Sequence, residues 1–128
     1  MITKASLGGI YVTDQQRALD FYTEKLGFEV RTDAPMDMGP GTPAGVRWLE
    51  VAPKGAETSF TLFTPPGMES RVGGFSNLVF GCDDVQKTVE DLRATGVEIS
   101  EEPHEAPWGG WWAQFKDPDG NEFGLSSS

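Results

Sequence analysis

The sequence predicts an α+β fold built from two repeated βαβββ modules. Two segments show the helical spacing of apolar residues, and each follows one β-rich segment and precedes three more. The same order occurs twice, about 70 residues apart: VTD at 12–14 matches CDD at 82–84, and LGFEV matches TGVEI. A period of this length indicates duplicated modules within one fold and not a solenoid. In each module the helix covers one sheet face, so the other face must be buried elsewhere or border a cavity.

The chain of 128 residues is long enough to bury a core as a single domain, which we expect to cover residues 1–128. Its 38% hydrophobic and 23% charged residues are ordinary for a soluble globular protein. The segment PPGMESRVGG is rich in proline and glycine and lacks a periodic pattern, which indicates a linker. We place the first module at 1–65, the linker at 66–72 and the second module at 73–128.

The first module begins with the β-rich segment SLGGIYVT. Thr13 or Asp14 then caps a helix that carries Ala18, Phe21, Tyr22 and Leu26 on one stripe and ends at the next glycine. The segment DAPMDMGPGTPAG is predicted to be a loop. The expected elements are a strand at 6–13, a helix at 14–27, and strands at 28–32, 46–52 and 58–64.

The second module repeats this order. Asp83 or Asp84 caps a helix with Val85, Val89 and Leu92 on one stripe, and Gly96 ends it. The segment DPDG at 117–120 has proline and glycine where a β-turn needs them. The expected elements are a strand at 75–82, a helix at 85–96, a strand at 97–100, a loop at 101–110, and strands at 111–117 and 121–127.

The net charge of −10 argues against a nucleic-acid partner, because a phosphate backbone requires a basic face. It is compatible with a cationic ligand, although solubility is the favoured explanation of the charge. No apolar run approaches the roughly 20 residues of a membrane span, so no membrane partner is expected. The absence of a secretory pattern at Met1 and of a partner for Cys82 predicts a cytoplasmic protein.

The segment VTDQQRALDFYTEKLGFEV, its second-module counterpart and the DPDGN turn together resemble the vicinal oxygen chelate superfamily. This superfamily includes the glyoxalases, the bleomycin-resistance proteins and the extradiol dioxygenases. The resemblance covers essentially the whole chain. It implies mixed, curved sheets of paired modules that enclose a cavity, usually in a homodimer. In the metal-dependent members, histidine and glutamate residues from both modules bind a divalent metal.

The positions of those ligands in this chain carry other residues. Leu7 and Asn77 stand seven residues before the capping aspartates, where the resemblance implies histidine. Gly124 stands where a glutamate follows the DPDGN turn, and the remaining ligand falls at Thr61 or Phe63. Divalent metals require several histidine or carboxylate ligands. We therefore expect no metal site and no cofactor.

Strand alternation then predicts which residues line the cavity that the resemblance implies. The lining is aromatic and apolar with a few polar groups, as in a small-molecule pocket. Trp48 and Trp112 fit equally well as pocket walls and as core or interface residues. The predicted ligand-binding residues are Leu7, Tyr11, Trp48, Thr61, Phe63, Asn77, Trp112, Gln114, Glu122 and Gly124.

Two functions from different classes follow. The first is a metal-free protein that binds a hydrophobic or cationic small molecule, as the bleomycin-resistance proteins do. The alternative is a lyase, isomerase or dioxygenase of the vicinal oxygen chelate type. An enzyme without a metal would need Glu122, Glu50 or His104 for proton transfer, and no other catalytic residues suggest themselves. His104 lies in the polar segment EEPHEAP, which favours a solvated loop residue.

Overall fold

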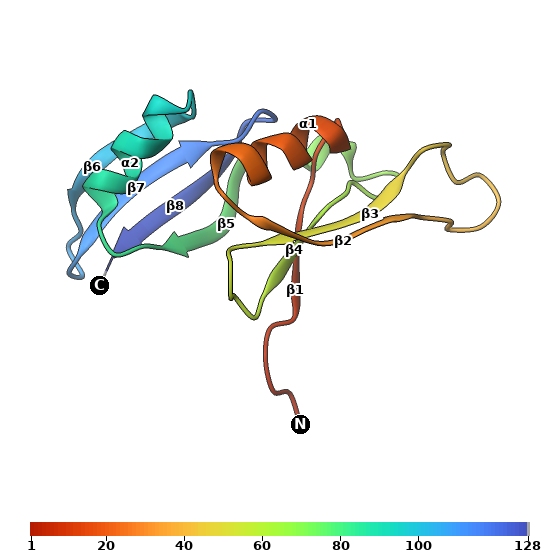
Figure 1. The fold of residues 1–128 in the computed structure, drawn as a ribbon, viewed down its shortest axis with the longest axis horizontal. Coiled ribbons are helices and arrows are strands. Elements are labelled where there is room, and N and C mark those ends of the chain that lie inside the picture. The colour runs from red at the N-terminus through yellow and green to blue at the C-terminus, as the bar shows by residue number, and fades with distance from the viewer. Residues whose placement is uncertain (128) are drawn as a thin grey trace. The chain divides into compact units, whose positions relative to one another are not determined.

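The computed structural model describes residues 1–127 and divides into two compact units, Met1–Val72 and Gly73–Ser128 (Figure 1). Each unit has one four-stranded mixed sheet, and neither sheet is closed. The α+β class and the two βαβββ modules are therefore confirmed. Among residues 1–127, no helix has the length and apolar character needed to cross a bilayer.

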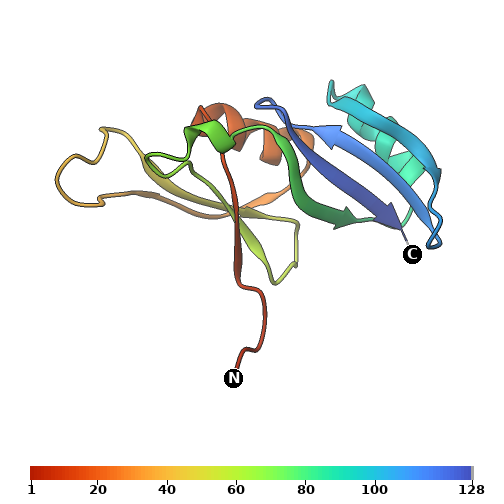
Figure 2. The same ribbon diagram turned by 180° about the vertical axis from the view of Figure 1, so that it is seen from behind.

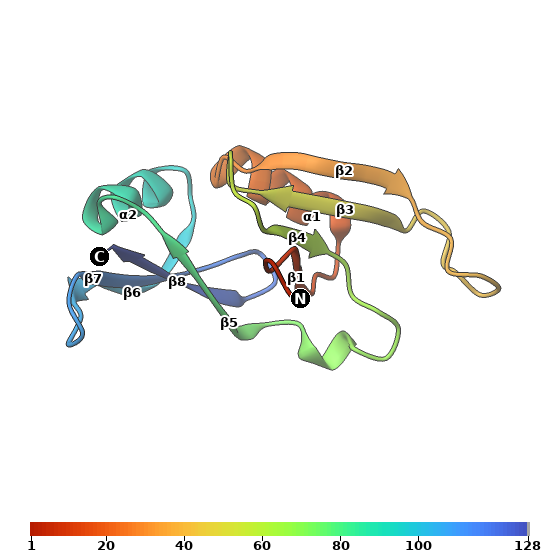
Figure 3. The same cartoon turned by 90° about the horizontal axis from the view of Figure 1, so that it is seen from below.

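Unit 1 has the strand order β1-β4-β3-β2, with β1 parallel to β4 and the other neighbours antiparallel. Figure 3 shows β2, β3 and β4 side by side, with α1 on one face of the sheet. The elements of unit 1 are β1 (Leu7–Ile10), α1 (Gln15–Asp20), the π-helix η1 (Phe21–Lys25), β2 (Glu29–Pro35), β3 (Arg47–Ala52), β4 (Ser59–Leu62) and the 3₁₀-helix η2 (Glu69–Arg71).

Asp14 caps the first helix, because its Oδ1 accepts a hydrogen bond of 3.0 Å from the backbone N–H of Arg17. The prediction of one continuous α-helix is wrong, since the chain changes to a π-helical turn after Asp20. The wider turn allows Phe21 and Tyr22, which are adjacent in sequence, to be buried together. Their rings meet edge to face at 5.1 Å.

Unit 2 has the strand order β5-β8-β7-β6, with β5 parallel to β8. Figure 2 shows this sheet from the side opposite to α2. The elements of unit 2 are β5 (Gly74–Gly81), α2 (Val85–Ala94), β6 (Glu98–Glu105), β7 (Trp111–Lys116) and β8 (Asn121–Ser127).

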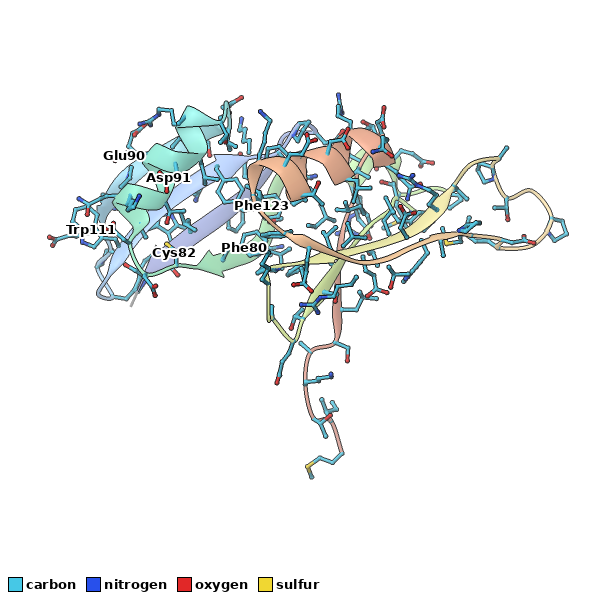
Figure 4. The ribbon with its side chains drawn as sticks, in the orientation of Figure 1. Phe80, Cys82, Glu90, Asp91, Trp111 and Phe123 are labelled. Carbon is cyan, nitrogen blue, oxygen red and sulfur yellow. The ribbon has the colours of Figure 1, made fainter. Side chains whose placement is uncertain are left out.

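Asp84 caps α2 by accepting a hydrogen bond of 3.0 Å from the N–H of Lys87. The buried face of α2 packs on the sheet through Val85 and Val89, which cluster with Ala113 and Leu125. An aromatic layer extends this core, because the rings of Phe80 and Phe123 lie 5.4 Å apart (Figure 4). Cys82 packs against the same cluster.

The predicted loop at 101–110 is wrong over its first half, because β6 continues to Glu105. Pro103 lacks an N–H and ordinarily interrupts a strand. Here the pairing with β7 shifts register between Glu101 and His104, and such a bulge on an edge strand accommodates proline. As a result, His104 lies in a strand and directly opposite Trp112.

Candidate functional site

Each sheet has one face covered by its helix and another that we call the open face. In unit 1, Ile10, Leu49 and Val51 are buried in the core. Leu7, on the open face, is 46% exposed, and Trp48 is half-buried. The predicted alternation of side chains along β1 and β3 is therefore confirmed.

The pairing of the strands shows which positions of the two modules correspond. Gly9 of β1 lies opposite Thr61 of β4, and Val79 of β5 lies opposite Gly124 of β8. Gly9 and Val79 are related by the repeat of 70 residues, so Thr61 is the counterpart of Gly124. The ligand position that the family resemblance implies at Thr61 or Phe63 therefore corresponds to Thr61. Phe63 lies beyond the end of β4, which ends at Leu62.

The third strands correspond in the same way. Glu50 and Gln114 each lie opposite this fourth-strand position, so they are counterparts. Two residues earlier on the same faces stand Trp48 and Trp112. Each open face therefore carries a tryptophan followed by a polar side chain, a carboxylate in unit 1 and an amide in unit 2.

Gly124 lies beneath the indole of Trp112. A Cβ atom added to Gly124 would be 2.8 Å from Cζ2 and 3.0 Å from Cζ3 of the indole, and closer still to Cη2. These separations are too short for a carbon contact, so only glycine fits under the ring. The place that the family resemblance assigns to a glutamate is thus covered by an aromatic ring.

Trp108 meets Trp112 edge to face, with ring centroids 5.8 Å apart and planes at 81°. It is 71% exposed at the turn between β6 and β7. Gly109 and Gly110 both have positive φ angles and form this turn. Trp108 also borders a cleft of about 450 Å³ on the Cys82 side of unit 2.

His104 is held by two acceptors next to Trp112. Its Nε2 lies 3.0 Å from Oε2 of Glu101, and its Nδ1 lies 3.1 Å from the carbonyl oxygen of Glu105. A neutral imidazole donates from one nitrogen only, so the doubly protonated ring satisfies both contacts. These contacts raise the pKa of His104 above its ordinary value, the Glu101 hydrogen bond most strongly. His104 is exposed as predicted, but it is a strand residue with fixed neighbours.

Glu50 accepts a hydrogen bond of 2.7 Å at Oε2 from the indole Nε1–H of Trp48. The two side chains are neighbours on the open face of β3, and both are half-buried. Glu50 lies between Thr32 of β2 and Thr61 of β4. The indole and the carboxylate thus form a fixed pair, which we call the Trp48–Glu50 pair.

The positions of the family's metal ligands do not provide suitable donors. Leu7 has no donor atom, and Gly124 has no side chain. Thr61 and Asn77 offer only neutral oxygen or amide groups, and Asn77 lies in a bulge of β5 with φ of 64°. Within residues 1–127, no group of three or more histidine, cysteine, aspartate or glutamate side chains is placed to hold a metal ion. The residues present therefore do not fit a divalent metal.

The remaining predicted residues occupy several places. Tyr11 follows β1 and is half-buried, and Gln114 is half-buried on β7. Glu122 lies on β8 between Phe75 and Lys116. Phe63 lines a separate cleft of about 710 Å³ within unit 1, together with Val12, Thr64, Arg47, Glu69 and Val72.

Two open-face residues were missed by the sequence analysis. The sequence predicts a loop at Glu101, but a register shift in β6 between Ile99 and Glu101 places this residue opposite Gln114. Thr32 was placed in a strand, but nothing in the sequence shows that it lies opposite Glu50. The pairing of Thr32 with Glu50 depends on a register shift in β2 between Val30 and Thr32.

Comparison with known proteins identifies the family. A family model described as the glyoxalase/bleomycin resistance protein/dioxygenase superfamily matches residues 5–125. The chain belongs to this superfamily. The predicted resemblance is therefore confirmed.

Three relatives illustrate this membership. YetH of Bacillus subtilis (strain 168) is 42% identical over 125 residues, which cover 98% of both chains. A superfamily member from Sphaerobacter thermophilus is 34% identical with a TM-score of 0.87, over 99% of this chain and 98% of that one. TnmS3, an antibiotic binding protein from Streptomyces sp. CB03234, is 39% identical with a TM-score of 0.81, over 98% of this chain and 96% of its own.

Proposed function

We propose that this protein binds a planar hydrophobic small molecule on the tryptophan-bearing open face of a unit, without a divalent metal. The observation that carries the proposal is the indole of Trp112 lying over Gly124. An aromatic surface stands where a metal-dependent member of the superfamily has a carboxylate. An indole over Gly124 favours stacking of a planar ligand over the binding of a metal ion.

The surroundings of Trp112 support this interpretation. Trp108 meets it at nearly a right angle, so the two rings form an aromatic corner. Such a corner offers one ring for face-to-face stacking and a second ring for an edge contact. Gln114 and Glu122 on the same face supply polar groups that can orient a ligand.

The relatives also support binding. TnmS3 is described as an antibiotic binding protein, and it is similar to this chain over nearly its full length. We infer that this chain sequesters a small molecule of that general kind. The alternative activity, that of a chelate-type lyase, isomerase or dioxygenase, would need metal ligands at positions held by Leu7, Thr61, Asn77 and Gly124.

Calorimetry on the EDTA-treated protein tests the proposal. Acridone serves as a neutral planar probe and metal-free bleomycin as a cationic one, and Zn²⁺, Ni²⁺ and Mn²⁺ are titrated in parallel. We expect at least one organic probe to bind and no metal to saturate a site. One tightly bound metal per chain, or no binding of either organic probe, would overturn the proposal.

Variants locate the binding surface. Trp112→Ala should weaken probe binding about tenfold, because an aromatic pair contributes up to about 1.5 kcal/mol beyond its buried area and about 1.4 kcal/mol is a factor of ten in affinity. Trp111→Phe is the matched control, since Trp111 is the neighbouring residue on β7 but packs against the core under α2. Equal affinities for the two variants would remove Trp112 from the site.

A further inference from the structure

We propose that Glu50 makes the open face of unit 1 selective for cationic planar ligands over neutral ones. This inference rests on the proposed function, because it assigns a ligand preference to one of the two tryptophan-bearing faces. Glu50 would act as a specificity-determining residue and Trp48 as the stacking surface.

The Trp48–Glu50 pair fixes a negative charge beside an aromatic ring. The hydrogen bond of 2.7 Å joins the ring nitrogen of Trp48 directly to a carboxylate oxygen of Glu50. A cation over the indole is attracted by the negative face of the ring, and tryptophan is the most effective side chain for this contact. The nearby carboxylate adds a second attraction that a neutral ligand does not experience.

The charge of Glu50 is not balanced by the arginines of β2 and β3, which are ion-paired elsewhere. Its cross-strand neighbours, Thr32 and Thr61, are neutral. Arg31 forms an ion pair with Glu29 at 2.9 Å, and Arg47 lies 3.6 Å from Asp33. The carboxylate therefore remains available to a positively charged ligand.

The second module provides an internal comparison. Trp112 corresponds to Trp48, but Gln114 stands in place of Glu50 and carries no charge. The carboxylate opposite Gln114, that of Glu101, is already hydrogen-bonded by His104. The two open faces thus offer similar stacking surfaces with different charge. We infer that the face bearing Trp48 favours a cationic planar ligand and that the face bearing Trp112 has no such preference.

Two probes with the same ring framework test this inference. 10-Methylacridinium is a permanent monocation, and acridone is neutral. Glu50→Gln removes the charge but keeps an oxygen that can accept the indole hydrogen bond. We expect this variant to bind 10-methylacridinium about twofold to fivefold more weakly, the range for a partly exposed charge pair, and to bind acridone unchanged.

Two further variants control for other effects. Glu90→Gln removes the same charge from the exposed surface of α2 (Figure 4) and should leave both affinities unchanged. Gln114→Glu installs a carboxylate beside Trp112 and should strengthen 10-methylacridinium binding without strengthening acridone binding. Circular dichroism confirms that each variant is folded before its affinity is compared.

The outcomes separate this inference from the proposed function. If neither probe binds the parent protein, the proposed function fails. Suppose that both probes bind, and that Glu50→Gln either changes both affinities by the same factor or changes neither affinity. The proposed function then stands, and the charge preference assigned to Glu50 is wrong. A loss of affinity for 10-methylacridinium alone, seen in Glu50→Gln but not in Glu90→Gln, supports the inference.

Discussion

Replacing Gly124 with alanine is predicted to push the Trp112 indole off the sheet. The new Cβ would lie 2.8 Å from Cζ2, whereas carbon atoms in contact are about 3.5 to 4.0 Å apart. The ring must therefore retreat by about 0.7 Å or more at this atom. Trp112 would lose part of its packing and its contact with Trp108, a change that typically costs about 1 to 3 kcal/mol.

A double-mutant cycle isolates this contact. In a Trp112→Ala background the clash is gone, so Gly124→Ala should be neutral or stabilise the strand by about 0.5 to 1 kcal/mol. Urea unfolding of the four proteins then gives a coupling energy of about 1 to 4 kcal/mol between the two positions. A coupling below about 0.5 kcal/mol would refute the placement of the indole over Gly124.

Acridone affinity provides a second readout of the same change. In the otherwise native protein, Gly124→Ala displaces the stacking surface and should weaken acridone binding. Unchanged affinity and an unchanged tryptophan emission spectrum would show that the ring does not cover Gly124. The result would then remove the main support for the proposed function.

Two further predictions concern other contacts. The contact of His104 with Glu101 raises the pKa of His104 above 6.5, so its stabilising effect is complete below that value and is lost as the pH rises through the raised pKa. Glu101→Gln should return the pKa of His104 toward its ordinary value in an NMR titration of this single histidine, and an unchanged titration would show that the contact is absent. The side chain of Gln15 forms hydrogen bonds with the backbone N–H and C=O of Arg47 and with the carbonyl of Leu62 in β4. Gln15→Ala should therefore lower the free energy of unfolding, measured in urea, by about 1 to 3 kcal/mol. Gln16→Ala, at an exposed position, should change it by less than about 0.5 kcal/mol, and equal losses for the two variants would contradict this role.

The sequence was sufficient to predict the module repeat, the capped helices and the faces of most strands. These features depend on local patterns, such as the alternation of Leu49, Glu50 and Val51, that a single segment contains. The sequence also predicts that Gly124 stands in place of a metal ligand, which stays a prediction. It could not show why glycine is required there, because the ring above it belongs to another strand.

Other features depend on pairing between strands. The choice between Thr61 and Phe63 required the register of β4 against β1. Pro103 suggested a loop, but a bulge in β6 accommodates it and brings His104 opposite Trp112. Tertiary packing also explains the π-helical turn at Phe21, where two adjacent aromatic residues must both be buried. The conformational propensities of the residues in one segment contain no information about these contacts with other segments.

The binding of a planar ligand at Trp112 without a metal is tested most directly by a calorimetric titration of acridone into EDTA-treated protein. Trp112→Ala and Trp111→Phe are measured alongside. We expect saturable binding without metal, retained in Trp111→Phe and weakened about tenfold in Trp112→Ala. Binding that appears only after a divalent metal is restored, or that is equal in the two variants, would contradict it.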